Sequence, residues 1–276
     1  MDNSITDEYC SAVLAENYSV VAAAETALLK FDTRKPACIL DRAEIAIDQA
    51  FSDTLNSIQV KDSKILTADD SGEVKEFSEA EFSPLKSLNA HSNLAIRAEY
   101  NPDTSNEIVS IGMDFTLNIW NSKKSESKPY LSIDVQKELN ASRIGEAGQL
   151  CNPPFPLDFS FRPGYTNYYY LSLGDGSLLE VKKAKKSKTK HSLDLTSQNQ
   201  VTYDKLVRAK FATSSHILTL AKDSLKVHQL ASEEPFLDMQ EIEDLQYEGS
   251  PNDMVIAGNQ VFVAEESPIV KVFEFQ

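Results

Sequence analysis

Short apolar runs alternate with polar turns along the whole chain, and the pattern is clearest at residues 107–121. In this stretch, EIVSIGMDFTLNIWN, side chains alternate with period two on either side of a short turn at Asp114. Successive side chains of a β-strand point to opposite faces, so a period of two is typical of strands. Two such runs around a short polar turn predict an antiparallel hairpin.

The same hairpin pattern recurs along the chain. Clear copies lie at residues 63–77, 167–181 and 215–230, and weaker ones at residues 17–31 and 258–273. The predicted turns fall at Glu25, Asp70, Asp114, Asp175, Asp223 and Glu266, with gaps of 45, 44, 61, 48 and 43 residues. All but the longest gap are close to the spacing of about 40–45 residues for a four-stranded propeller blade.

These repeats predict a single all-β domain, a β-propeller that covers residues 1–276. One four-stranded blade cannot bury both of its apolar faces, whereas blades stacked around a ring bury each face on the next blade. Six blades are visible, or seven if one is missing or has diverged, and each hairpin is expected to be the middle pair of its blade. The predicted blades cover residues 4–48, 49–93, 94–140, 150–200, 201–247 and 248–276. The polar segment 121–150 is expected to be an insertion loop.

Four residues of the third repeat resemble the signature of the WD-repeat family. His91 lies before the predicted blade, Ser110 on its second strand, Asp114 in the turn, and Trp120 on the third strand. The resemblance implies a hydrogen-bonded chain of these side chains, because an indole, a hydroxyl, an imidazole and a carboxylate can satisfy one another when buried. It also implies that His91 is structural rather than catalytic.

A longer stretch is similar to one branch of that family. The segments LTADDSGEVKEF, LNAHSNLAIRAEYNP, EIVSIGMDFTLNIW and GQLCNPPFPLDFSF resemble WD repeat-containing protein 53 and its plant relatives. The GQLCNPPFP segment, residues 148–156, is the most specific part, since a generic WD repeat does not require it. The resemblance implies a protein–protein interaction scaffold, in particular a substrate receptor that docks on the DNA-damage-binding adaptor of cullin-RING ubiquitin ligases. The alternative is a nuclear WD-repeat scaffold in chromatin modification or ribosome assembly.

Such receptors often dock through a W-D-x-R box at the end of a blade's third strand. The residues Phe31-Asp32-Thr33-Arg34 match three of the four positions, whereas Trp120-Asn121-Ser122-Lys123 lack both the Asp and the Arg. The resemblance implies that Asp32 pins the turn and that Arg34 presents a planar fork of donors to an acidic partner. The alternative is that Arg34 is an ordinary solvated charge at a blade edge.

Composition narrows the classes of function. The net charge is −15 and the isoelectric point is about 4.7, and an acidic surface repels phosphates, so we do not expect direct binding of nucleic acids. The three cysteines form no C-x-x-C pair, and no Walker, G-x-S-x-G or H-E-x-x-H motif is present. We therefore expect no metal, no cofactor and no enzymatic activity. A polar N-terminus and the lack of a long apolar run predict neither a secretion signal nor a membrane span.

Six lysines interrupt this acidic background between Lys182 and Lys190. Such a run predicts a nuclear localisation signal, a basic hook for an acidic partner, or simply a solvated loop. Together with the unpaired cysteines, which fit a reducing compartment, it predicts a nuclear and/or cytoplasmic location.

Overall fold

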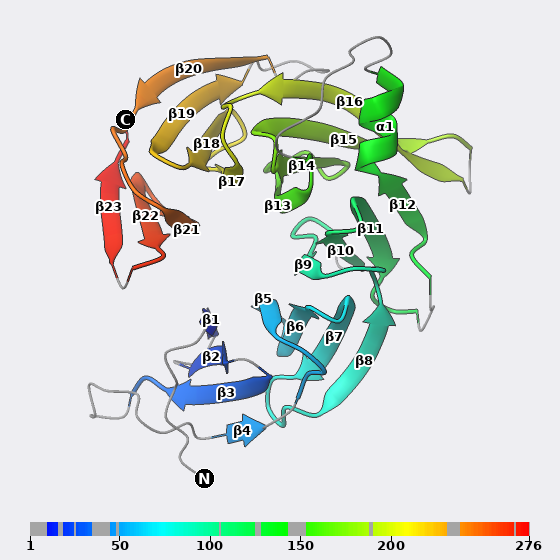
Figure 1. Ribbon diagram of the computed structural model, residues 1–276. Helices are drawn as coiled ribbons and strands as arrows, with labels where there is room; N and C mark the ends of the chain where they lie inside the picture. Colours follow the sequence, from blue (N-terminus) through cyan, green and yellow to red (C-terminus); the bar gives the residue numbers. More distant parts are fainter. Residues whose placement is uncertain are drawn as a thin grey trace. The chain divides into compact units, whose positions relative to one another are not determined.

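A computed structural model describes most of the chain, and Figure 1 labels its elements. The described residues are 10–15, 19–24, 26–34, 45–47, 50–104, 106–124, 128–142, 153–187, 190–230, 238–267 and 269–275. They form strands β1 to β23 and one helix, α1 (Val135–Ser142). Each strand pairs in antiparallel fashion with its neighbour in sequence, for example β6 with β7 and β18 with β19.

The chain divides into two compact units. The first comprises residues 1–100, 106–114 and 118–130, and the second comprises residues 101–105, 115–117 and 131–276. The first sheet of the first unit contains β1 (Cys10–Ala15), β2 (Ser19–Ala24), β3 (Ala27–Asp32) and β4 (Ile45–Ile47). Its second sheet contains β5 (Leu55–Lys61), β6 (Lys64–Asp69), β7 (Glu73–Ser78) and β8 (Pro84–Asn89). The boundary between the units passes through the third sheet, of β9 (Ala95–Tyr100), β10 (Glu107–Gly112), β11 (Thr116–Asn121) and β12 (Leu131–Asp134).

The second unit contains the remaining sheets. The fourth sheet consists of β13 (Pro156–Phe161), β14 (Tyr168–Leu173), β15 (Ser177–Lys185) and β16 (His191–Gln200). The fifth consists of β17 (Leu206–Phe211), β18 (His216–Ala221), β19 (Ser224–Leu230) and β20 (Met239–Asp244). The last sheet has the strands β21 (Pro251–Ala257), β22 (Gln260–Glu265) and β23 (Val270–Glu274).

The number of blades differs from the prediction. Five sheets are complete four-stranded blades, and the last has only three strands among the described residues, so the prediction of six or seven blades is wrong in number. The predicted hairpins do form the middle pair of each complete blade, and β22 pairs with β23 in the last sheet. The reason for the error is that a hairpin pattern reports the two middle strands and carries no information about a fourth, outer strand.

The expected insertion loop at residues 121–150 is also not a loop throughout. It contains β12, the outer strand of the third blade, followed directly by α1. Among residues 135–140 of the helix, Val135 and Leu139 are buried, four residues apart on one face. A four-residue strand is too short to show alternation in sequence, which explains why the segment looked like a polar loop. Residues 125–127 and 143–150 lie outside the described part of the chain.

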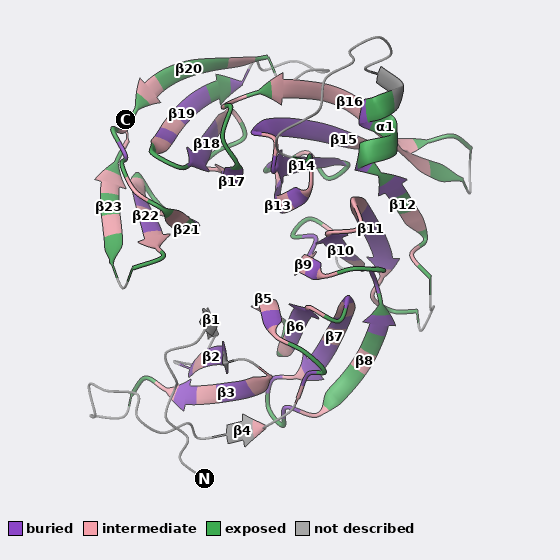
Figure 2. Ribbon diagram, in the orientation of Figure 1, coloured by how far each residue is buried: buried purple, intermediate pink, exposed green. Residues whose placement is uncertain are grey.

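Burial follows the position of a strand in its sheet. In the complete blades, Figure 2 shows the middle strands largely buried, and every residue of β14 is buried although only alternate side chains share a face. The outer strands β8 and β20 are largely exposed. Middle strands are covered on both faces because the sheets stack on one another. In the first unit β5 packs against β9, and in the second unit β13 packs against β17.

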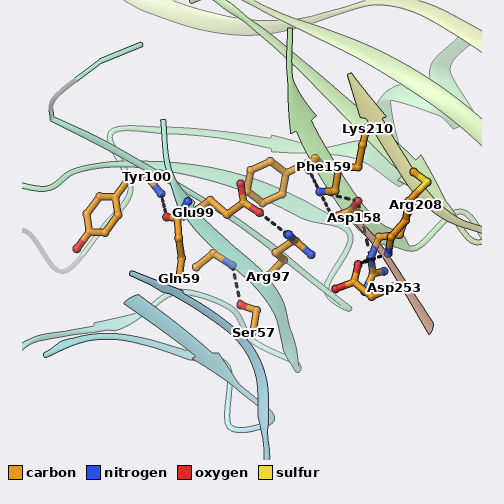
Figure 3. A network of polar contacts seen from close by, with 12 residues as sticks. Ser57, Gln59, Arg97, Glu99, Tyr100, Asp158, Phe159, Arg208, Lys210 and Asp253 are labelled. Carbon is orange, nitrogen blue, oxygen red and sulfur yellow. Dashed lines mark hydrogen bonds and ion pairs between the residues drawn. The ribbon is translucent and has the colours of Figure 1, made fainter. Parts of the chain in front are cut away.

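Polar side chains join the first strands of neighbouring sheets within each unit (Figure 3). In the first unit, Ser57 Oγ accepts a hydrogen bond from the Ala98 backbone N–H, and Gln59 Oε1 accepts one from Tyr100. In the second unit, Lys210 Nζ lies 3.0 Å from Oδ2 of Asp158, whose carboxylate is fully buried. Each bond connects two sheets, so it holds stacked blades in register. A buried carboxylate requires such a partner, since an unpaired one would be strongly destabilising.

In the second to fifth sheets, the turn before the third strand uses a left-handed residue. The residues with positive φ at this place are Gly72, Phe115, Gly176 and Asp223. Phe115 is not a glycine, and its ring stacks on Phe155 with centroids 4.3 Å apart, while its carbonyl accepts a hydrogen bond from Val135 N–H. These contacts offset the cost of a left-handed backbone for a bulky side chain.

We predict that Gly176→Ala destabilises the protein by roughly 2 kcal/mol or more. A Cβ at this position would lie 2.2 Å from the Thr202 carbonyl oxygen and 2.4 Å from that of Asp204, and backbone atoms cannot move aside cheaply. Gly164 is the matched control, because its φ of +82° is almost the same and a Cβ there would meet nothing within 4 Å. Urea denaturation should show the smaller loss for Gly164→Ala, about 1 kcal/mol. Equal losses would contradict the steric argument.

Candidate functional site

The four residues of the predicted network lie together in the third blade. His91 follows β8, Ser110 is on β10, Asp114 is in the turn, and Trp120 is on β11. Trp120 Nε1 donates to Ser110 Oγ over 3.1 Å, Ser110 Oγ lies 2.9 Å from His91 Nε2, and His91 Nδ1 lies 2.9 Å from Asp114 Oδ1. The four side chains therefore form one continuous chain from strand to loop.

The direction of the hydrogen bonds follows from the donors available. An indole can only donate, so Ser110 accepts from Trp120 and uses its own proton toward His91 Nε2. His91 then carries its proton on Nδ1 and donates it to Asp114. The other carboxylate oxygen of Asp114 accepts the backbone N–H of Ser92 over 2.9 Å. Every polar group of the network is thus satisfied by one arrangement of protons.

A glycine makes room for the imidazole. A Cβ at Gly112 would lie 2.6 Å from the ring of His91, so no larger residue fits beside it. The imidazole is fully buried as a result. Close approach of the ring to the strand is what brings Nε2 within reach of the hydroxyl.

Serine, histidine and aspartate in one hydrogen-bonded line also make up a hydrolase triad. In such a triad the serine hydroxyl must reach a substrate carbonyl. Here Ser110 is completely buried, and Trp120 occupies its acceptor side. The arrangement therefore acts as an internal brace in the third blade.

A second, reduced form of this network lies in the fifth blade. Trp120 lies five residues after the left-handed residue Phe115, and His228 lies five residues after the left-handed residue Asp223. His228 Nε2 is hydrogen-bonded to Thr219 Oγ1 at 2.8 Å, and both residues are buried. No sequence motif pointed to a partner for His228. An alignment of TLNIW at 116–120 with SLKVH at 224–228 would have found it.

The expected partner-binding residues lie at the end of β3. The backbone N–H of Arg34 donates to Asp32 Oδ1 at 2.9 Å, so the aspartate holds the turn. Arg34 Nε and Nη2 each lie 2.9 Å from an oxygen of the same carboxylate. The side chain of Arg34 is 66% exposed, but its fork is bound by Asp32 rather than directed outward. Phe31, in the place of the tryptophan of the box, is buried in the first blade.

The third blade contains the same turn without the arginine. The backbone N–H of Lys123 donates to Asn121 Oδ1 at 3.0 Å, which repeats the contact of Arg34 with Asp32. Asparagine supplies the same acceptor as aspartate but no charge, and an ammonium group cannot form a planar fork. The two turns therefore share a shape and differ in charge.

Several expected features lie partly outside the described residues. Cys38 and Cys151 are among these, as are residues 148–152 of the GQLCNPPFP segment and residues 188–189 of the lysine run. In the described remainder of that segment, Phe155 carries the stacking contact with Phe115. Among the described residues, no group of three or more His, Cys, Asp or Glu side chains is placed to hold a metal ion. No helix in the described part of the chain is long and apolar enough to cross a membrane.

Known proteins were compared with the chain in sequence and in structure. No protein-family model matches it. The WD repeat-containing protein 53 homolog of Dictyostelium discoideum is 24% identical over 211 residues, which cover 71% of this chain and 56% of that protein. The chain thus spans little more than half the length of this curated relative. A chain in the crystal structure of the mitotic checkpoint complex matches with a TM-score of 0.75 and 11% identity, over 98% of this chain and 76% of that one. At this identity the structural match shows the fold alone.

We predict that Asp114→Ala lowers the free energy of unfolding by about 1–3 kcal/mol. The change leaves His91 Nδ1 and the Ser92 backbone N–H without their acceptor. Asp204→Ala is the control, because this aspartate is exposed and its side chain has no hydrogen bond or ion pair among the described residues. Chemical denaturation that gives the same midpoint for both variants would rule out a bracing role for Asp114.

We also predict a pH-dependent contribution from His228. Burial lowers the pKa of His228 below its ordinary value of 6.5, with Lys226 adding to the shift and Glu241 opposing it. Between the lowered pKa and 6.5 the unfolded chain binds more protons than the folded chain, so stability falls as the pH decreases through this range. The loss in melting temperature between about pH 7.5 and about pH 5.5 should be smaller in His228→Gln, which can bond Thr219 but cannot take up a proton. A loss in His228→Gln equal to that of the wild-type protein would contradict the role of this histidine.

Proposed function

We propose that this chain, which folds as a β-propeller and is similar to a WD-repeat protein, is a protein–protein interaction scaffold. The observation that carries this proposal is the way the third blade uses its reactive side chains. Internal hydrogen bonds occupy the polar groups of Ser110, His91 and Asp114 and hold a loop against two strands. A rigid blade with its turns at the surface is suited to holding partners, since binding then requires little ordering of the scaffold.

In particular, we propose a substrate receptor of a cullin-RING ubiquitin ligase, with the DNA-damage-binding adaptor as its partner. Support comes from the three-of-four match at Phe31-Asp32-Thr33-Arg34 and from the similarity to the WD repeat-containing protein 53 homolog. The proposed location is nuclear and/or cytoplasmic. A scaffold of chromatin modification or ribosome assembly would bind its partners without this adaptor.

Asp32 is proposed to position Arg34 for the adaptor. Two bonds of 2.9 Å hold the guanidinium in one orientation at the surface, although the side chain remains 66% exposed. An arginine carries five N–H donors, so a partner carboxylate can bind a second edge of the group or replace Asp32. Holding the side chain in place reduces the entropy lost when a partner binds.

We predict that Arg34→Glu weakens adaptor binding by roughly thirtyfold or more, because it places like charges together at the contact. Stability should change by less than about 0.5 kcal/mol, as is usual for an exposed site. Arg34→Lys should also weaken binding, since an ammonium cannot copy the fork. The measurement is titration of the purified adaptor by surface plasmon resonance, with thermal melting of each variant.

The third blade provides the matched control. Lys123→Glu reverses a charge at the corresponding turn and should leave adaptor binding unchanged. Full binding by Arg34→Glu would overturn the receptor proposal and leave the general scaffold in place. Failure of the wild-type protein to bind the adaptor at all would favour the chromatin or ribosome-assembly alternative.

A further inference from the structure

The hairpin of the fourth blade is longer than those of the other blades. β15 has nine residues and β16 has ten, whereas the third strands β3, β7, β11 and β19 have six or seven. Pairing of β14 with β15 reaches only as far as Tyr168 and Lys182. The ladder of β15 with β16 continues for three further pairs, to Lys185 and His191. Residues 183–187 and 190–193 therefore form a two-stranded extension, which we call the basic arm (Figure 1).

The arm has a defined backbone as far as its turn. Its last ladder pair is Lys185 with His191, and the Lys186 N–H then donates to the Lys190 carbonyl over 2.8 Å. At its base, the Lys183 N–H donates to the Asn167 carbonyl over 2.7 Å. This part of the lysine run is thus held in a β-ladder, in which alternate residues direct their backbone N–H and C=O groups to the other strand. A receptor that reads the run as an extended localisation signal would have to open the arm.

The ladder sorts the charges of the arm onto two faces. Directly opposed residues share a face, and neighbours along a strand lie on opposite faces. Lys183 and Lys185 therefore share one face with His191, whereas the carboxylate of Asp194 lies on the other. On that other face Asp194 is 3.4 Å from Lys186, and Lys182 lies over the ring of Tyr168.

The outer end of the arm is open to solvent. Lys185, Lys190 and His191 are exposed, and among the described residues no ion pair joins any of these three to a carboxylate. The whole chain has a net charge of −15, so the arm is a local exception in an acidic protein. Concentrated positive charge on a projecting element attracts an anionic partner and repels cationic ones.

We propose that the basic arm binds an acidic, extended segment of a partner protein. Side chains two residues apart on a strand lie about 7 Å apart, and alternate side chains of an extended peptide have the same spacing. Carboxylates at every second position of such a segment can therefore match Lys183 and Lys185 together. A nucleic acid fits less well, because its long polyanionic backbone would also meet the acidic remainder of the surface. The proposal concerns a surface distinct from the turn of Asp32 and Arg34, so the two can fail independently.

The test uses the full chain and a fluorescein-labelled peptide with glutamate at alternate positions, followed by fluorescence anisotropy. Binding to the wild-type protein should weaken several-fold between about 50 mM and about 300 mM salt, as expected for charge pairing at a surface. The peptide with glutamine in place of glutamate should not bind. Single-stranded DNA of similar length is titrated in the same way, so that its binding can be compared with that of the peptide.

Variants of the arm locate the site. Lys183→Glu/Lys185→Glu should weaken peptide binding at least about tenfold, and Lys183→Gln/Lys185→Gln should give a smaller loss with less risk to folding. The control Lys205→Glu/Lys222→Glu changes the net charge equally at exposed lysines outside the arm and should lose less than about twofold. Equal losses in the arm and control variants, tighter binding of DNA than of the peptide, or no binding by the wild-type protein would each overturn the proposal.

Discussion

The third blade depends on one buried hydroxyl, that of Ser110. It accepts a hydrogen bond from the indole N–H of Trp120 and donates one to His91 Nε2. The other ring nitrogen of His91 is hydrogen-bonded to Asp114. A buried polar group that loses its hydrogen-bond partner lowers the free energy of unfolding by about 1–3 kcal/mol. The removal of any member of the network therefore destabilises the blade, because it leaves a neighbouring polar group without a partner. Since the residues come from a loop, two strands and a turn, the network fixes the positions of backbone segments that are far apart in sequence.

Other blades fill the position of Trp120 in simpler ways. Counting five residues from the left-handed turn residues gives Phe77 in the second blade, Val181 in the fourth and His228 in the fifth. The first two are buried apolar side chains, and the third keeps a single bond to Thr219. Apolar packing alone is thus sufficient for a blade. The full network adds rigidity where a loop must be held against the sheet.

Charge is used differently inside the protein and at its surface. The buried carboxylate of Asp158 is paired with Lys210 from the next sheet, and so it holds these two blades in register. At the surface, the turn of Asp32 and Arg34 and the basic arm carry charge on well-defined backbone. Interior pairs are already satisfied, whereas exposed charges on rigid supports can exchange water for a partner at little entropic cost. This division suits the proposed role of a scaffold that binds proteins.

The hairpins could be predicted from the order of the residues alone, and the members of the Ser110 network from the resemblance to the WD-repeat signature. Period-two alternation around a turn depends only on neighbours along the chain, so it is readable without a fold. The number of complete blades, the strand β12 within residues 121–150 and the bond of His228 to Thr219 depend instead on long-range packing. An outer strand is stabilised by hydrogen bonds to another strand rather than by its own apolar pattern, and four residues such as LSID show no period. A buried histidine likewise acquires its role from the side chain that packing places beside it.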